Sequence, residues 1–330
     1  MRTRSCFLAF TLMSAACNAN VSEAVLSHGV EGPTAVKVDA TKMKDHINEL
    51  QSLSYGGRLP GTEGERLAVA YVEKQFEALG LAKKFTDSYR QYFDYSGSKI
   101  ANVIGVMEGT DDALKQEVIL VTSHLDLLGQ SDDCKGNSAL VDKLTCPGAD
   151  DNASGVAAML EMARLAVENS PKPKRTVVFI AFNAEEQGLY GSKYYVANPL
   201  FPLANVKAAL NLDMVGAGDG SGVTLLGTLK SNALDQDPAR YWILTLMKKS
   251  AKNMGLNYEV LSWKPDNNAD CFPLDDAGVS CVFIWSNPDS AHNQYHTPKD
   301  NISIISTKAL LATGQLVWAV LQPLSQGIDN

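Results

Sequence analysis

Five residues of the kinds that hold divalent metal ions are spread along this 330-residue chain. Two are imidazoles and three are carboxylates: His124, Asp151, Glu186, Asp213 and His296. This set suits two divalent ions if one carboxylate bridges them and each ion keeps an additional ligand and a shared water. Nitrogen and oxygen ligands without thiolate favour zinc, with cobalt and manganese as open alternatives.

Each of these residues has an ordinary structural explanation when it is taken alone. A histidine at a strand end is more often a hydrogen-bonded core residue than a ligand, and adjacent Glu185 and Glu186 could be a solvated charge pair. Asp151 could cap a helix, and His296 in "YHTP" could belong to a turn. Asp213 differs, because it follows the apolar stretch of "ALNLDMVG" and a buried carboxylate without a cation is costly. Five such coincidences at strand ends are improbable, so we interpret the residues as one site.

Two further carboxylates could serve hydrolysis at such a site. Adjacent Glu185 and Glu186 point in different directions on an extended or turning backbone, so Glu186 can bind metal while Glu185 faces the water. Glu185 would take a proton from the attacking water and deliver it to the leaving amine. Asp126 stands two residues after His124, on the same face of an extended segment. It could accept the imidazole N–H and orient the ring, although it could also be an ordinary loop carboxylate.

Four short apolar runs, rich in β-branched residues, predict strands that are buried on both faces: 118–122, 176–182, 206–212 and 279–285. A run of helical periodicity at 154–168 lies between the first two, and a strand, helix, strand order implies a largely parallel sheet. We therefore expect one α/β domain with a mostly parallel, mixed central sheet and helices on both faces. His124, Glu185 and Asp213 each follow one of these runs, which places them in one crevice at the carboxyl ends of the strands.

Two more helices are expected outside this core. Thr62 and Glu65 form a capping box that opens a helix running towards Gly80. Its apolar stripe consists of Leu67, Tyr71, Val72, Phe76 and Leu79. A closing helix at 307–321 covers one face of the sheet. The stretch before Thr62 shows no clear periodicity.

Residues 1–19 resemble a signal peptide, which leaves 20–330 as the catalytic domain. Arg2 and Arg4 precede a short apolar run and the small residues of positions 14–16. This predicts an exported protein, periplasmic or extracellular, and the run is too short to span a bilayer. Cys17 could carry a lipid, but Ser14 stands where such signals usually have leucine, so we do not favour an anchor.

Four cysteines follow the signal-like segment, an even number that predicts disulfides in an exported chain. Of the three possible connectivities we favour the two local loops, Cys134 with Cys146 and Cys271 with Cys281. A cysteine-ligated zinc is the weaker alternative, because no C-x-x-C pair exists. The formal net charge of -8 argues against nucleic acid and against anionic membrane surfaces, and peptide substrates fit better. The oligomeric state is not predicted.

Several motifs, in their order along the chain, resemble the M28 family of zinc aminopeptidases, of the bacterial leucyl aminopeptidase type. They are "HLD", "PGADDNASGVAAMLEMAR", "VVFIAFNAEEQGLYGS", "NLDMVG" and "YHTPKDNI". The resemblance runs from about Arg58 to the last helix. It implies a zinc-exopeptidase fold and a secreted two-zinc enzyme that acts on peptides with a free N-terminus. It also implies Glu185 as the acid/base and the five ligands named above, with Asp151 bridging.

The resemblance also suggests roles for several further residues. Asp151 is chosen over Asp150 because the family aspartate stands four residues before the motif's last glycine, here Gly155, and a cis peptide bond after Asp151 is implied. Tyr295 resembles a tyrosine that donates to the oxyanion, although it could be a packing aromatic. Many relatives carry "SDH" where this chain has Ala269-Asp270-Cys271, and we assign Asp270 to substrate binding.

Two other functions remain as alternatives. Glutaminyl cyclase chemistry uses a similar fold with one zinc ion and transfers an acyl group internally instead of to water. A binding module of the same fold without catalysis is the second alternative. Degenerate modules lose ligands or the base, whereas this chain retains all of them, which favours a hydrolase.

Overall fold

The computed structural model describes residues 36–129, 134, 145–227, 241–261, 269–287 and 292–329. The predicted signal peptide and the lipid site considered at Cys17 lie outside these residues. Within the described ranges, no helix has both the length and the apolar character that crossing a bilayer requires.

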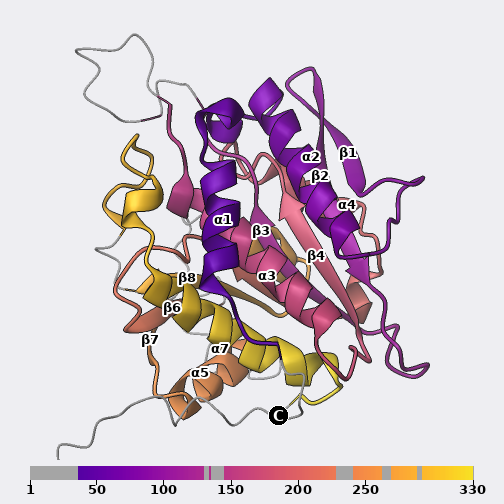
Figure 1. Ribbon diagram of the computed structural model, residues 1–330. Helices are drawn as coiled ribbons and strands as arrows, with labels where there is room; N and C mark the ends of the chain where they lie inside the picture. The colour runs from indigo at the N-terminus through magenta and orange to yellow at the C-terminus, as the bar shows by residue number, and fades with distance from the viewer. Residues whose placement is uncertain are drawn as a thin grey trace, which may run out of the picture.

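A single eight-stranded sheet forms the centre of the protein (Figure 1). Its strands are β1 (Arg90–Tyr95), β2 (Ser98–Met107), β3 (Val118–His124), β4 (Thr176–Phe182), β5 (Val206–Leu212), β6 (Gly222–Leu226), β7 (Asn257–Leu261) and β8 (Cys281–Asn287). The spatial order is β1-β2-β4-β3-β5-β8-β6-β7. The four central strands β4, β3, β5 and β8 are mutually parallel, whereas β2 and β6 run antiparallel to their central neighbours. The predicted mixed, mostly parallel sheet is confirmed.

The central strands are the apolar runs that the sequence marks. Every residue of β3 and β4 is buried, as expected for strands covered on both faces. The run 118–122 extends two residues further, so that His124 is the last residue of β3, opposite Phe182 of β4. The fourth run was placed slightly early, because β8 begins at Cys281 and continues to Asn287. The carboxyl ends of the three strands β3, β4 and β5 therefore meet at one edge.

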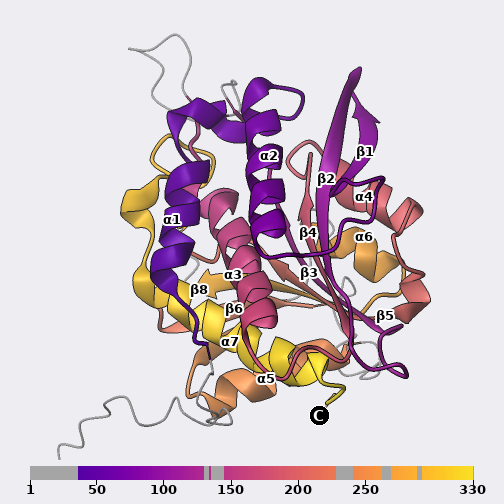
Figure 2. The same ribbon diagram turned by 45° about the vertical axis from the view of Figure 1, so that its right-hand side comes forward.

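Helices cover both faces of the sheet (Figures 1 and 2). The α-helices are α1 (Ala40–Leu50), α2 (Glu63–Ala78), α3 (Gly155–Glu168), α4 (Tyr190–Ala197), α5 (Trp242–Asn253), α6 (Cys271–Asp276) and α7 (Thr307–Ser325). Helices α1, α2, α3, α5 and α7 pack one main hydrophobic core against the sheet. Helices α4 and α6 pack a second core against the opposite face, where Tyr195 and Leu274 are fully buried.

Short helical turns complete the chain: η1 (Leu53–Arg58), η2 (Ala149–Ser154), η3 (Leu203–Asn205) and η5 (Ile302–Ile304). The turn η2 lies directly before α3 and is entirely buried, and its residues Asp151 and Asn152 have non-helical backbone angles. Asp151, which the resemblance implies as the bridging ligand, therefore lies in irregular backbone.

Helix α2 confirms one predicted helix and corrects its details. Thr62 is the N-cap, and its hydroxyl accepts a bond from the Glu65 amide at 3.4 Å. The Glu65 side chain does not complete a capping box, because it accepts a bond from Asn183 Nδ2 at 2.7 Å instead. The buried stripe is built on Ala68, Val72 and Phe76, whereas Leu67, expected in it, is 39% exposed.

Helix α1 was missed in the stretch that showed no clear periodicity. Its buried residues Met43, Ile47 and Leu50 recur at helical spacing. Asp39 caps it by accepting bonds from the amides of Thr41 at 2.9 Å and Lys42 at 3.2 Å. Both signals are present in the sequence.

Candidate metal and catalytic site

Five strand ends and loops bring the five expected ligands together at the carboxyl edge of the sheet. His124 ends β3, Asp213 follows β5, and Glu186 lies four residues beyond β4. Asp151 comes from η2, and His296 comes from the loop before η5. The parallel register of β3 with β4 and β5 is what aligns the first three at the same level.

The segment of Asp151 is fastened directly to the end of β5. Asn152 Nδ2 donates to the carbonyl of Leu212 at 3.0 Å, and Asn152 Oδ1 accepts bonds from the amides of Gly155 at 2.9 Å and Met214 at 3.2 Å. A Cβ atom at Gly155 would lie 2.3 Å from the Leu212 carbonyl, so this close approach requires glycine. The peptide bond between Asp151 and Asn152 is cis, as the resemblance implies. These contacts place Asp151 next to Asp213.

One group of possible ligand atoms comprises His124, Asp151 and Asp213. His124 Nε2 lies 3.2 Å from Asp151 Oδ1 and 3.5 Å from Asp213 Oδ1. The side chains of His124, Asp151 and Asp213 are 3%, 2% and 11% exposed, which leaves little room for water to solvate two carboxylates. Three ligands of this kind suit one divalent ion.

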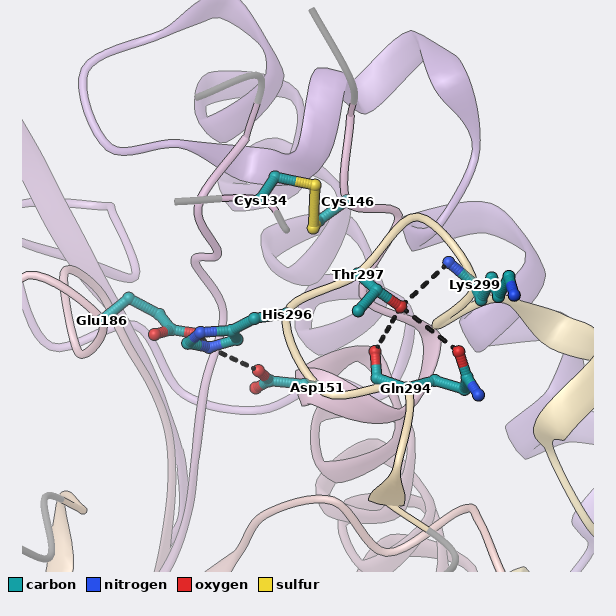
Figure 3. The surroundings of a disulfide bond; sticks show 8 residues. All are labelled: Cys134, Cys146, Asp151, Glu186, Gln294, His296, Thr297 and Lys299. Carbon is teal, nitrogen blue, oxygen red and sulfur yellow. Dashed lines mark hydrogen bonds and ion pairs between the residues drawn. A yellow bond between two sulfur atoms is a disulfide. The ribbon is translucent and has the colours of Figure 1, made fainter. Parts of the chain in front are cut away.

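A second group comprises Asp151, Glu186 and His296. His296 Nε2 lies 3.2 Å from Asp151 Oδ2 and 2.9 Å from Glu186 Oε1. Figure 3 shows His296 placed between these two carboxylates. In each group the ligand atoms lie within 4.8 Å of one another, and Asp151 belongs to both through its two oxygens.

The donor set fits divalent metal. Asp151 Oδ2 is buried, and none of the described residues gives it a hydrogen bond of good geometry, although His296 Nε2 is close. A buried carboxylate oxygen normally has a donor or a cation. Two imidazole nitrogens and three carboxylates that converge without thiolate are the ligands that zinc accepts.

The electrostatics of the cluster follow from burial and from its excess of carboxylates. Burial opposes a charged His124 ring, but the charges of Asp213 and Glu185 outweigh it and hold its pKa well above the ordinary value. Burial likewise opposes a charged His296, yet the adjacent carboxylates of Asp151 and Glu186 raise the pKa to about 9. Both imidazoles are thus more basic than usual because of the carboxylates around them.

The carboxylates themselves divide into two kinds. Burial opposes ionisation of Asp151, but the adjacent imidazoles of His124 and His296 outweigh it and keep its pKa below the ordinary value. Burial and the charge of Asp151 raise the pKa of Glu186 to about 8. Burial also raises the pKa of Asp213. The ion-paired carboxylate at the centre is thus the readiest to ionise.

Glu185 lies beside the ligands and is 8% exposed. Burial raises its pKa well above the ordinary value, and the nearby charge of Asp270 adds to this effect. A carboxylate with a raised pKa has a higher proton affinity, which suits a group that must accept a proton and release it again.

Asp126 acts on the backbone of the two glutamates instead of on the imidazole. Its Oδ1 accepts the Glu185 amide at 3.0 Å and its Oδ2 accepts the Glu186 amide at 3.2 Å. The expected bond to His124 is absent from this geometry, because His124 Nδ1 lies 3.9 Å from Asp126 Oδ1 and 3.2 Å from the Asp126 carbonyl oxygen. Asp126 therefore fixes the turn that separates Glu185 from Glu186.

The sequence analysis missed a set of contacts, made by side-chain amides, that also hold the turn at Glu185. Asn183 Nδ2 donates to Glu65 Oε1 at 2.7 Å, and the Asn183 amide donates to Asn102 Oδ1 at 3.0 Å. Asn183 Oδ1 in turn accepts the Ala184 amide at 2.9 Å. All three polar side chains are buried. Through these bonds, Glu65 of α2 and Asn102 of β2 hold Asn183. Asn183 in turn holds the amide of Ala184, the residue before Glu185.

Arg58 was noted only as the start of the resemblance, yet its fully buried guanidinium clamps the backbone around the ligands. Its five N–H groups face five carbonyl oxygens, those of Leu50, Leu125, Pro147 and Gly148 at 2.8–3.0 Å and of Asp151 at 3.4 Å. Burial lowers the pKa of Arg58, and the charges of Asp151 and Asp300 oppose this shift. Two of the five carbonyls adjoin or belong to ligand residues.

Tyr295 and Asp270 lie near the cluster. The Tyr295 ring stacks on His296 with a centroid separation of 3.6 Å and is 47% exposed. Partial burial of its hydroxyl and the charge of Asp151 raise its pKa, so the hydroxyl keeps its proton. Asp270 is 1% exposed, and burial raises its pKa to about 7. Both side chains can therefore act as hydrogen-bond donors or acceptors close to the ligands.

The two favoured disulfides are present in the structure. Cys134 pairs with Cys146, and Cys271 pairs with Cys281. Asp151, Glu186 and His296 lie in the surroundings of the first disulfide (Figure 3). The Cys146 amide donates to the carbonyl of Gly129 at 3.2 Å. Most of the segment 130–147 falls outside the described residues.

Comparisons with known proteins agree with this geometry. Residues 102–321 match peptidase family M28. The chain is 30% identical over 269 residues to aminopeptidase YwaD of Bacillus subtilis, an alignment that covers 79% of this chain and 53% of the relative. The chain thus spans about half the length of that relative.

Two solved structures share the fold. BSAP, a zinc aminopeptidase from Bacillus subtilis, gives a TM-score of 0.66 at 19% identity, covering 87% of this chain and 95% of the other. A glutaminyl cyclase from Bacteroides thetaiotaomicron gives a TM-score of 0.66 at 24% identity, covering 87% and 98%. The fold is therefore common to proteins named for both chemistries, and the site has to distinguish them.

Proposed function

Because the chain belongs to peptidase family M28, we propose that it is an aminopeptidase that hydrolyses the N-terminal peptide bond of peptides. Two zinc ions would be held by the five ligands His124, Asp151, Glu186, Asp213 and His296, with Asp151 shared. Glu185 would be the general base.

The observation that supports two ions is the pair of ligand groups that meet in Asp151. Each group contains one imidazole and two carboxylates when Asp151 is counted in both. Divalent cations would also offset the negative charge of the ligand carboxylates, because uncompensated buried charge is strongly unfavourable.

When bound, the zinc ions would supply a water of lowered pKa and polarise the scissile carbonyl. The carboxylate of Glu185 would accept a proton from the water that attacks the carbonyl carbon. The carboxylic acid so formed then protonates the departing amine nitrogen, which restores Glu185. Asp126 supports both steps, since it holds the Glu185 and Glu186 amides and so keeps base and ligand pointing apart.

Two nearby side chains complete the proposed mechanism. The Tyr295 hydroxyl donates a hydrogen bond to the oxyanion that develops on the attacked carbonyl. The free ammonium group of the substrate requires negative charge, and Asp270, Asp213 and Glu185 are buried acids near one another. We assign Asp270 to ammonium binding because Asp213 belongs to a ligand group and Glu185 is the proposed base.

The metal content tests the two-ion assignment. The purified protein is expected to contain about two zinc ions per chain by elemental analysis, because two separate ligand groups exist. Removal of the ions with a chelator should abolish hydrolysis, and added Zn²⁺ should restore it. A content of one ion contradicts the two-ion assignment and favours the cyclase alternative if hydrolysis is absent, or single-metal hydrolysis if it is present. Cobalt or manganese in place of zinc would change only the identity of the metal.

The requirement for a free N-terminus has its own test. A chromogenic aminoacyl substrate with a free amine should be cleaved at least about 100-fold faster than its N-acetylated counterpart, because a site built for a charged group rejects an analogue that lacks it. Measurement of kcat/KM for both compounds on the zinc-loaded protein decides this. Equal rates would indicate an endopeptidase or a different hydrolase.

We also propose that the protein is exported to the periplasm or the cell exterior. The signal-like residues 1–19 and the two disulfides support this location, because disulfides persist in oxidising compartments.

A further inference from the structure

The loop that carries His296 is fastened at both of its ends to the segment that carries Asp151. We call residues 292–300 the His296 loop. At one end, His292 Nδ1 lies 2.7 Å from Asp150 Oδ2. At the other end, Asp300 Oδ1 accepts the Asp150 amide at 2.7 Å and Asp300 Oδ2 accepts the Asp151 amide at 3.0 Å. The Asp300 carbonyl also accepts the Ala149 amide at 3.2 Å. The two ends of the loop are thus bound to η2, His292 to Asp150 and Asp300 to the consecutive residues 149–151.

These two anchors are buried and connect to the sheet. His292, Asp150 and Asp300 are 6%, 1% and 2% exposed. Asp150 Oδ1 accepts the amides of Gly216 at 2.8 Å and Ala217 at 3.0 Å, in the segment that follows β5. His292 Nε2 donates to the carbonyl of Ser286 in β8 at 3.0 Å. Buried hydrogen bonds to charged groups are strong and directional, so the anchors define where the loop lies.

His296 itself needs such support. Its backbone φ is 56°, in the left-handed region that residues other than glycine rarely adopt. Such a conformation persists when the surrounding structure determines it. Within the loop, the Thr297 hydroxyl donates to the Gln294 carbonyl at 2.7 Å and accepts the Lys299 amide at 3.2 Å (Figure 3). The loop is a small unit of its own, and its position depends on the anchors at its ends.

We propose that Asp300 and His292 are positioning residues for the metal ion held by Asp151, Glu186 and His296. The inference rests on the two-ion function proposed above. His124 and Asp213 follow from strands β3 and β5 and do not depend on the His296 loop. Asp151, which belongs to both ligand groups, is also held by Arg58 and by the bonds of Asn152 to the end of β5. Loss of an anchor therefore displaces His296 most. The ion of the His124 group keeps its ligands, whereas the ion of the His296 group loses affinity.

Zinc titration of the metal-free protein tests this selectivity. Zn²⁺ is added in competition with a chromophoric chelator to the wild type, Asp300→Asn and His292→Gln. The wild type should bind two ions. Each variant should bind one ion with wild-type affinity and the other about 10–100-fold more weakly, the range for loss of a group that supports a metal ligand. Lys299→Ala, an exposed position on the same loop, is the matched control and should bind as the wild type does.

The outcomes separate the two proposals. A wild type that binds a single ion contradicts the two-ion function. If the wild type binds two ions, the positioning role is contradicted by variants that keep both affinities. It is also contradicted by variants that lose both affinities equally, since equal loss indicates a general structural effect. Thermal unfolding of the metal-free variants reports on folding. If Asp300→Asn fails to fold, His292→Gln, which alters the other anchor alone, still gives a decisive titration. Excess Zn²⁺ should restore the second ion and the turnover of the folded variants.

Discussion

Replacement of Glu185 by glutamine is expected to lower kcat by about 10²–10⁴-fold, the contribution typical of general acid–base catalysis. Glutamine preserves the shape of the side chain but cannot accept the proton of the attacking water. Glu185 is in neither ligand group, so the zinc content of the variant should remain at the wild-type value. Steady-state kinetics and elemental analysis of the same preparation measure both quantities.

The neighbouring residue provides the control. Glu186→Gln makes the same chemical change one position away but removes a carboxylate of the His296 group. This variant should lose zinc affinity, and excess Zn²⁺ should recover part of its activity, whereas no zinc concentration should rescue Glu185→Gln. The assignment of the base is wrong if Glu185→Gln retains a tenth or more of the wild-type kcat.

Replacement of Arg58 by methionine should reduce the free energy of unfolding by at least about 3 kcal/mol, because several buried carbonyl groups lose their donor and each such loss costs about 1–3 kcal/mol. The affected carbonyls belong to Leu50, Leu125, Pro147 and Gly148, with a longer contact to Asp151. Urea unfolding of the metal-free protein gives the free energy.

Arg66→Met is the matched control for this change. Arg66 is an exposed arginine on α2 whose partner, Glu63, is also exposed, so its loss should cost less than about 0.5 kcal/mol. Arg58→Lys keeps the charge with fewer donors and should fall between the wild type and Arg58→Met. A cost below about 1 kcal/mol for Arg58→Met would show that the clamp contributes little to stability.

The sequence predicts the part of the site that depends on strand ends. Three apolar runs of the right length locate β3, β4 and β5, and the polar residues that follow them are His124, Glu186 and Asp213. Parallel strands present their carboxyl ends at one edge, so this part follows from periodicity. Asp151 and His296 lie in irregular backbone, and their inclusion depended on residue type and on the resemblance.

The supporting contacts could not be predicted in the same way. Arg58 in "GGRLPG" has the appearance of a surface charge, and its partners are carbonyl groups up to 93 residues away. Asp126 was assigned to the imidazole because side chains alternate along a strand, but β3 ends at His124 and the chain turns there. Contacts between a side chain and distant backbone depend on tertiary structure, which no local pattern records.

The sheet edges and the first helix show two further reasons for incomplete prediction. Strands β1 and β2 form an antiparallel hairpin at one edge, and only one of the two is largely buried. An edge strand carries a weaker apolar signal than a central one. Helix α1 is a different case, because its cap and its apolar spacing were available and were overlooked.

The guanidinium clamp of Arg58 also bears on how the protein acquires its cofactor. Small zinc domains fold only when the ion arrives, because nothing else holds their ligands together. Here one arginine joins the end of α1, the residue after His124 and the backbone of Asp151. We therefore expect folding to precede metal loading, so that the metal-free protein keeps its ligand backbone in place and can bind metal afterwards.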